Sequence, residues 1–295
     1  MTVQIEIFSC LKTALGECPQ WDAQSGSLWL MDCREGTIFQ LDQTGEVVSR
    51  LQAQPPCGSF ALLTQGGVLV AEKENLLVIG QDGARQVVAE LGISHPNLRF
   101  NDGACLADGS FVLGTMHLHR EAGEAALGGI YRLTPEGNFQ WLAAGLGVAN
   151  GPCVSPVDGR FYICDSTARD IYSFDLTRDG FGPRKLFAST DAYGSSPDGC
   201  CFDSEGGLWT ALVHAGAILQ LTPDGSLDQR IDLPLAHPTA LSFGGPDMTD
   251  LYVTSISDSG RLTASGHADG KVLKITGTGF SGFARPRFAM ERALA

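Results

Sequence analysis

Three oxygen-bearing side chains stand at equivalent places in short segments that lie far apart in the chain. Glu17 opens the segment ECPQW, Asn150 opens NGPCV and Asp198 opens DGCCF. Each segment places its polar side chain just before a turn residue and a short apolar strand. If the three openings converge in space, they supply carboxylate and amide oxygens, the ligands that a hard divalent cation prefers. Taken singly, each is better explained as a turn former.

The three segments belong to a longer repeat. Similar units of strand, turn and strand begin at six places, namely Glu17, Cys57, Asn101, Asn150, Asp198 and His237. The starts are roughly 40 to 49 residues apart, the period of four-stranded propeller blades. A further alternating strand follows most copies, as at residues 38–42 (IFQLD), but no clear match follows Glu72 in the second copy.

This repeat predicts an all-β fold, a single six-bladed β-propeller domain over residues 1–295 with four antiparallel strands per blade. The N-terminal strand at residues 3–8 is available to complete the last blade and close the ring. A linear solenoid is the alternative architecture for a repeat of this length. In a propeller the innermost strands line the central channel, so Glu17, Asn150 and Asp198 are expected at one mouth of it.

Composition excludes several classes of function. The net charge is −13, without the basic footprint of a nucleic-acid-binding protein. The nine cysteines lack zinc-ribbon spacing, and their odd number in a long chain argues against a disulfide framework. The N-terminus lacks the pattern of a signal peptide, and no apolar window of about 18 residues could span a membrane. We therefore expect a cytoplasmic protein with no membrane or nucleic-acid partner.

Several motifs, in order along nearly the whole chain, resemble those of the regucalcin (senescence marker protein)/gluconolactonase/LRE-like family. They are LGECPQW at 15–21, RFNDG at 99–103, GTM at 114–116, NGP at 150–152 and SPDG at 196–199. The resemblance implies a six-bladed propeller that hydrolyses sugar lactones with one divalent metal ion. The shared order is much more specific than any one motif.

Motif by motif, the resemblance implies roles for individual residues. Glu17, Asn150 and Asp198 correspond to the metal ligands, and Arg99 and Asn101 to substrate-binding residues. The mixed ligand set does not select one metal. Calcium or zinc is the first expectation, with manganese, magnesium or ferrous iron as alternatives.

One position departs from the family pattern. After the GTM motif some members carry carboxylates that touch the substrate, whereas this chain has His117 and His119. Two histidines at i and i+2 lie on one side of a strand. They are expected to contact sugar hydroxyls, with solvent-facing positions or extra metal ligation as alternatives. The loop at residues 119–129 is either a lid over the mouth or an ordinary surface loop.

The leading functional hypothesis is metal-dependent hydrolysis of an aldonolactone such as gluconolactone to the aldonic acid. The metal ion would polarise the lactone carbonyl and Asp198 would assist the attacking water. One alternative is a propeller-type organophosphate or aryl-ester hydrolase, and another is a non-enzymatic calcium-binding regulatory protein. The expected partner is a small-molecule sugar lactone, and the protein is expected to be a monomer or a weak homo-oligomer.

Overall fold

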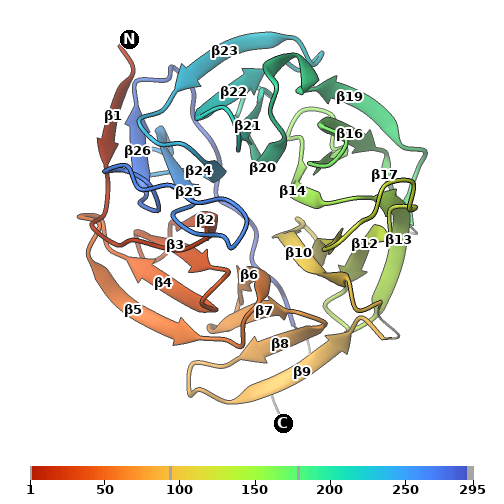
Figure 1. Ribbon diagram of the computed structural model, residues 1–295. Coiled ribbons are helices and arrows are strands. Elements are labelled where there is room, and N and C mark those ends of the chain that lie inside the picture. The colour runs from red at the N-terminus through yellow and green to blue at the C-terminus, as the bar shows by residue number, and fades with distance from the viewer. Residues whose placement is uncertain (1, 93–94, 178–179, 291–295) are drawn as a thin grey trace.

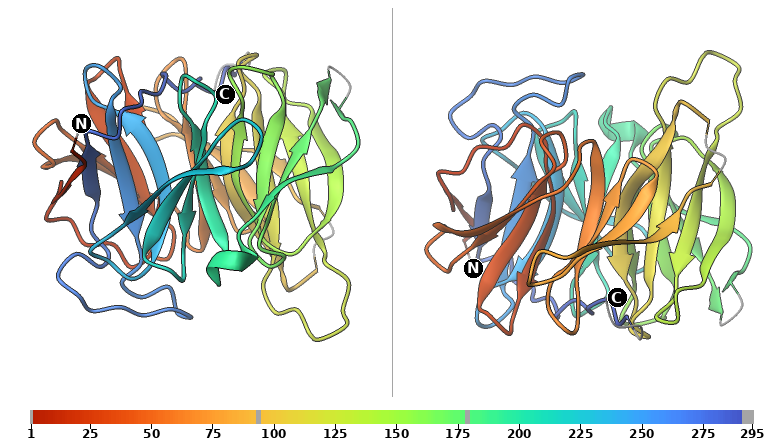
Figure 2. Two further views of the ribbon diagram at one scale, coloured as in Figure 1. Left: turned by 90° about the horizontal axis from the view of Figure 1, so that it is seen from above. Right: turned by 90° about the horizontal axis from the view of Figure 1, so that it is seen from below.

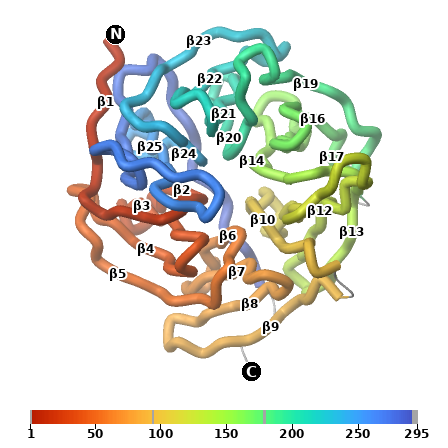
Figure 3. Tube along the Cα trace, in the orientation of Figure 1, coloured from red at the N-terminus to blue at the C-terminus, as the bar shows by residue number. Residues whose placement is uncertain are grey.

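Six four-stranded antiparallel sheets stand around a central axis in the computed structural model of the chain (Figure 1). The structure describes residues 2–92, 95–177 and 180–290. The Cα trace passes from one sheet to the next around the ring (Figure 3). The predicted six-bladed β-propeller is therefore confirmed.

The strands take equivalent places in each blade. The innermost strands are β2 (Gly16–Asp22), β6 (Cys57–Leu62), β10 (Leu98–Cys105), β14 (Ala149–Val154), β20 (Pro197–Phe202) and β24 (Pro238–Gly244). The second strands are β3 (Ser27–Asp32), β7 (Val68–Glu72), β11 (Phe111–His117), β15 (Phe161–Asp165), β21 (Leu208–Leu212) and β25 (Asp250–Ser255). The third strands are β4 (Thr37–Leu41), β8 (Asn75–Ile79), β12 (Gly128–Leu133), β16 (Asp170–Phe174), β22 (Ala217–Leu221) and β26 (Leu273–Thr276). The outer strands are β5 (Val47–Gln52), β9 (Arg85–Glu90), β13 (Phe139–Leu146), β19 (Lys185–Ser189), β23 (Leu227–Asp232) and β1 (Gln4–Ile7). Two short pieces lie outside the blades, the hairpin β17 (Leu176–Thr177) with β18 (Gly180–Phe181) and the 3₁₀ turn η1 (Asp191–Tyr193).

The N-terminal strand closes the ring, as predicted. β1 pairs antiparallel with β26, with Gln4 opposite Thr276 and Ile7 opposite Leu273. The last blade is thus built from both ends of the chain, which leaves no blade incomplete. The second blade also has its third strand, β8, which the sequence pattern did not reveal because only two residues separate it from β7.

Each innermost strand carries an irregularity close to its first residue. The register with the second strand shifts between Glu17 and Gln20, Cys57 and Ser59, Phe100 and Gly103, Asn150 and Cys153, Pro197 and Cys200, and Pro238 and Leu241. A β-bulge bends the strand and turns side chains away from the regular alternation. The six bulges lie in the same phase of the repeat, so they bend all six inner strands at the same end of the channel.

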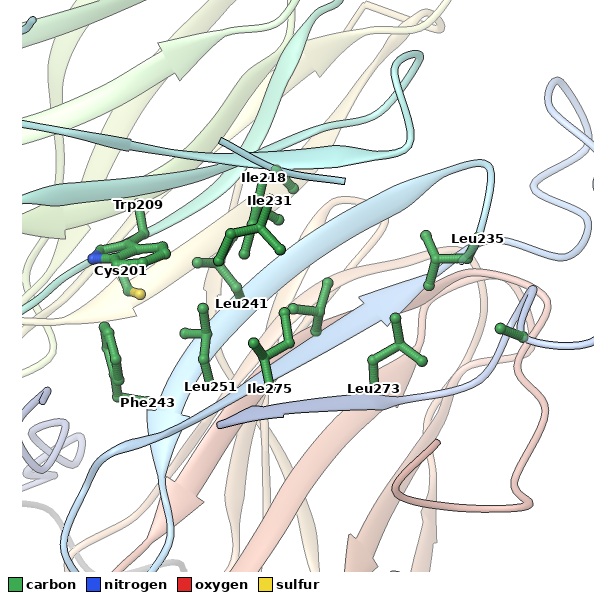
Figure 4. Packing of buried hydrophobic residues seen from close by; sticks show 13 residues of the cluster. Cys201, Trp209, Ile218, Ile231, Leu235, Leu241, Phe243, Leu251, Leu273 and Ile275 are labelled. Carbon is green, nitrogen blue, oxygen red and sulfur yellow. The ribbon is translucent and has the colours of Figure 1, made fainter. Parts of the chain in front are cut away.

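Apolar side chains fill the space between neighbouring blades. Between the fifth and sixth blades Trp209, which is fully buried, packs edge-to-face on Phe243 with ring centroids 5.8 Å apart (Figure 4). The indole Nε1–H donates to Asp203 Oδ2 at 2.9 Å, so its polar atom is satisfied inside the core. This packing fixes the positions of the inner strands that carry the polar side chains of the channel.

The C-terminal segment crosses one face of the ring, opposite the face from which loops 118–127 and 256–272 project (Figure 2). Phe288 is 1% exposed, and its N–H donates to Leu62 O at 2.9 Å. Arg287 pairs with Asp22 at 2.6 Å. Burial acts to raise the pKa of Asp22, but hydrogen bonds from Ser25 and Arg287 outweigh it and hold that pKa below its usual value. The segment therefore closes this end of the channel.

Candidate functional site

A cavity of about 550 Å³ lies at the other end of the propeller axis. Side chains from the beginnings of four innermost strands line it, namely Glu17, Arg99, Asn101, Asn150 and Asp198. The bulges lie at these positions. Five of the seven expected site residues therefore share one cavity, although the longest separation among them in sequence exceeds half of the chain.

Two carboxylates in this cavity have no hydrogen-bond donor. Asp198 is 9% exposed and Glu17 is partly exposed to the cavity. None of the described residues donates a hydrogen bond to either carboxylate or forms an ion pair with it. Burial raises the pKa of Asp198, and burial followed by the charge of Asp198 raises the pKa of Glu17. Two close, desolvated carboxylates without a partner are costly unless a positive charge compensates them.

The two asparagines are held by a network that links three blades. Asn101 Nδ2 donates to Ala149 O at 2.9 Å and also to Asn150 Oδ1. Asn150 Nδ2 donates to Ser166 Oγ at 2.9 Å, and the Ser166 hydroxyl donates to Pro197 O at 2.7 Å. The network fixes which way the Asn150 amide faces, because its nitrogen is committed to Ser166. One lone pair of Asn150 Oδ1 remains for a ligand.

Arg99 places a guanidinium inside the same cavity. It is 9% exposed, and its Nη1 donates to Phe100 O at 2.7 Å. Burial lowers the pKa of Arg99, and the charge of Glu17 acts in the opposite direction. With several N–H groups left over, Arg99 is placed to donate to the hydroxyl or ring oxygens of a polar ligand.

Asp102 is a partly buried carboxylate beside the cavity to which the sequence analysis gave no role. It lies in the bulge of β10, where Oδ2 accepts the N–H of Gly151 at 2.9 Å and Oδ1 accepts that of Gly103 at 2.8 Å. Gly151 has φ of 59°, and a Cβ there would lie 2.7 Å from Asp198 O. Asp102 thus holds the tight crossing between the strands that carry Asn150 and Asp198. The position of Asp102 inside the NDG motif is the sequence signal that could have identified it as a site residue.

The two histidines do not line this cavity. His117 and His119 line a neighbouring pocket of about 510 Å³, which shares four lining residues with the first, namely Leu118, Val148, Thr167 and Arg261. β11 ends at His117, so His119 lies beyond the strand and the expected i, i+2 strand geometry is wrong. The His117 side chain is 0% exposed and lies 3.7 Å from Glu124, whereas His119 is exposed.

The loop expected at residues 119–129 is shorter than predicted, because β12 begins at Gly128. It projects from the face of the ring that carries the cavity (Figure 2). No three histidine, cysteine, aspartate or glutamate side chains in the described part of the chain lie together in a way that could hold a metal ion. A metal site in the cavity must therefore include an amide oxygen or water.

A second cavity, of about 380 Å³, occupies the opposite end of the axis under the C-terminal segment. Its walls are mostly apolar, with cysteine and phenylalanine side chains, and Arg285 is its one charged lining residue among those described. All nine cysteines of the chain are free. Polar chemistry is thus concentrated at the end of the axis that carries Asp198. No helix in residues 2–92, 95–177 and 180–290 is long and apolar enough to cross a membrane.

Fold and site together define a class, the six-bladed propellers that gather carboxylates and amides at one end of the axis. Residues 15–257 match the family model described as the SMP-30/Gluconolactonase/LRE-like region, and the chain belongs to this family.

Its relatives include a 6-deoxy-6-sulfogluconolactonase of Pseudomonas putida, 35% identical over 82% of this chain and 84% of that protein. Regucalcin of Gallus gallus is 30% identical over 98% of this chain and 99% of its own length. Among solved structures, a calcium-binding regucalcin from Agrobacterium tumefaciens has a TM-score of 0.84 and 26% identity, covering 96% of both chains. A luciferin-regenerating enzyme has a TM-score of 0.87 at 21% identity over 98% of this chain and 100% of its own, and this likeness concerns the fold.

Proposed function

We propose that this protein is a divalent-metal-dependent lactonase that hydrolyses an aldonolactone to the aldonic acid. The observation that carries the proposal is the pair of neighbouring carboxylates in the cavity, the buried Asp198 and the partly exposed Glu17, which accept no hydrogen bond and form no ion pair among the described residues. The kinship with a relative named as a sulfogluconolactonase supports a sugar lactone as substrate. This mechanism uses water as the nucleophile.

Glu17, Asn150 and Asp198 would hold the ion. Their oxygens are the ligand type of a hard cation, and the fixed Asn150 amide turns its oxygen away from Ser166. Two carboxylates and one amide do not distinguish calcium from zinc, manganese, magnesium or ferrous iron. A divalent cation bound there would supply the Lewis acidity that polarises a lactone carbonyl.

The side chains of the cavity would activate the water and hold the substrate. Asp198 would orient the attacking water and accept its proton at a carboxylate oxygen as the new C–O bond forms. Cleavage of the ring C–O bond then leaves an alkoxide, which takes the proton held by Asp198, so that the free hydroxyl of the aldonic acid forms and the Asp198 carboxylate is regenerated. Arg99 and Asn101 would hold ring hydroxyls and so fix the carbonyl relative to Asp198.

Two measurements test this proposal. Asp198→Ala should lower kcat for glucono-1,5-lactone, followed by proton release near pH 6.5 with metal restored, by about 100-fold or more. The matched control, Asp228→Ala on the exposed outer strand β23, should retain wild-type kcat. Treatment with EDTA should abolish turnover, and add-back of each candidate metal should restore it. Near-normal kcat in Asp198→Ala would remove this residue from the chemistry, and turnover indifferent to chelation would remove the metal.

A second candidate is a calcium-binding regulatory protein without hydrolytic activity. Full-length similarity to regucalcins, one of them described as calcium-binding, favours it. It would show calcium binding that depends on Glu17 and Asp198 without turnover of any lactone in a panel. An organophosphate or aryl-ester hydrolase would instead turn over paraoxon or aryl esters faster than lactones.

A further inference from the structure

The mouth of the axial cavity is rich in arginine, although the chain as a whole carries a net charge of −13. Arg261 lies in the loop between β25 and β26 and lines both the axial cavity and the neighbouring pocket. Arg120, in the loop after β11, lines the neighbouring pocket. Both loops project from the same face of the ring (Figure 2). Positive charge is thus collected where a ligand would enter.

These two arginines are not used in ion pairs. No carboxylate of the described residues lies within ion-pair distance of Arg120 or Arg261. Arg34 also lines the cavity but, unlike these two, it forms an ion pair, with Asp258 at 3.2 Å. Arg261 donates to the backbone carbonyl of Leu118, which ties the two loops together and fixes its guanidinium over the opening.

The acidic groups nearby leave the arginines uncompensated. Glu124 lies 3.7 Å from His117 and accepts the backbone N–H of Glu121, so it is engaged within its own loop. Glu121 is the one acid among the described residues that lines the neighbouring pocket, and it forms an ion pair with neither Arg120 nor Arg261. Arg261 also adds to the positive charge that Arg99 meets inside the axial cavity. An anionic ligand would relieve this repulsion.

We propose that the lactone substrate carries an anionic group, such as a sulfonate, phosphate or carboxylate, at the end remote from the lactone carbonyl, and that Arg261 with Arg120 binds it. This inference rests on the proposed lactonase function and specifies its substrate class. Guanidinium groups bind the oxygens of such anions through paired charge-assisted hydrogen bonds.

The layout of the cavity also sets the direction in which this substrate binds. The carboxylates of Glu17 and Asp198 lie at the beginnings of inner strands, whereas Arg261 lies in a loop at the rim. Hydrolysis requires the lactone carbonyl to reach Asp198, so the end of the substrate remote from the carbonyl lies toward the rim, where its charged group meets Arg261. The charged tail therefore lies between the two loops.

The kinetic test compares glucono-1,5-lactone with lactones that carry a phosphate or a sulfonate on carbon 6, and with a glucaric acid lactone that carries a carboxylate. We expect wild-type kcat/KM to be higher for at least one anionic lactone. Arg261→Gln should lower the ratio of anionic to neutral kcat/KM by about 10- to 100-fold, and Arg120→Gln should act in the same direction. Glu121→Gln should raise the ratio. The three anions show whether the pocket prefers sulfonate, phosphate or carboxylate.

A matched control removes a positive charge elsewhere. Arg50→Gln on the outer strand β5 should leave the ratio unchanged, which separates local binding from the effect of net charge. High salt should reduce the advantage of the anionic lactones in the wild type, because exposed charges are screened. Wild-type values that are equal for neutral and anionic lactones, or an unchanged ratio in Arg261→Gln, would overturn the anion site while leaving lactonase activity intact.

Binding of the products provides a readout that does not depend on turnover. Titration calorimetry with 6-phosphogluconate, 6-deoxy-6-sulfogluconate, glucarate and gluconate should show that at least one acid with a second anionic group binds more tightly than gluconate, and this difference should be lost in Arg261→Gln. If no lactone is hydrolysed but this difference remains, the proposed function fails and the anion site stands. If all four acids bind alike, the anion site is wrong.

Discussion

Replacing Asp198 by asparagine should stabilise the metal-free protein while it abolishes hydrolysis. The side chain is 9% exposed, and none of the described residues donates a hydrogen bond to it. Its charge also raises the pKa of Glu17, after the larger effect of burial. Asn keeps the size of the side chain and removes the charge, so the change relieves desolvation and repulsion together.

The expected gain follows from two opposing terms. An uncompensated buried charge costs about 3–5 kcal/mol, whereas a buried amide that lacks a partner costs about 1–3 kcal/mol. The difference is a net stabilisation of about 2 kcal/mol. For a chain of this length that corresponds to a rise in Tm of about 4 °C. With metal present, the stability difference between variant and wild type changes sign. An ion at 100 times its Kd would stabilise the wild type by about 2.7 kcal/mol and the variant by less.

Thermal unfolding measured by calorimetry or fluorescence, once in EDTA and once with each metal, checks this reversal. Asp198→Asn should melt above the wild type in EDTA and below it with metal, with lactone turnover lost in both conditions. Asp228→Asn on β23 should match the wild type throughout, since that side chain is exposed. A variant that melts below the wild type in EDTA would show that the carboxylate is stabilised by the protein itself, and the argument for a cation site would fail.

The other predictions concern residues around the site and at the opposite face. Asp102→Asn should weaken metal binding by about tenfold, measured by calorimetric titration, because the amide offers one acceptor where two N–H groups now bind. Asp22→Asn should lower Tm at neutral pH, and the difference should shrink as pH falls below about 3.9 and vanish only below the lowered pKa of the folded state, since such a group stabilises the fold only while it is ionised. Phe288→Ala should cost about 3–5 kcal/mol in urea unfolding, whereas Phe283→Ala, which is 41% exposed, should cost less than about 1 kcal/mol.

The sequence predicted the ring because its repeat is long and regular. Glu17, Asn150 and Asp198 occupy equivalent positions in their repeats. In a ring of blades, equivalent positions lie at the same end of the axis. The third strand of the second blade was missed for a local reason. β8 follows β7 after two residues, without the turn residues and aromatic pattern that marked the other copies.

Side chains whose roles depend on irregular backbone were harder to predict. Asp102 stands next to Asn101, yet the bulge in β10 directs it to the N–H groups of Gly151 and Gly103. His119 was placed on a strand that ends two residues earlier. Neither the bulge nor the strand end follows from the alternation of apolar residues.

Arg261 shows what a repeat cannot reveal. It lies in the loop between β25 and β26, which is longer than the corresponding loops of the other blades, and its contact with Leu118 joins the sixth blade to the third across the mouth of the cavity. In the proposed function, residues in the same phase of the inner strands carry the reaction, while the loops at the rim would decide which ligand is held. The chemistry of the reaction and the choice of substrate are therefore assigned to different parts of the chain, and a substitution in the loop can change substrate preference without disturbing Asp198.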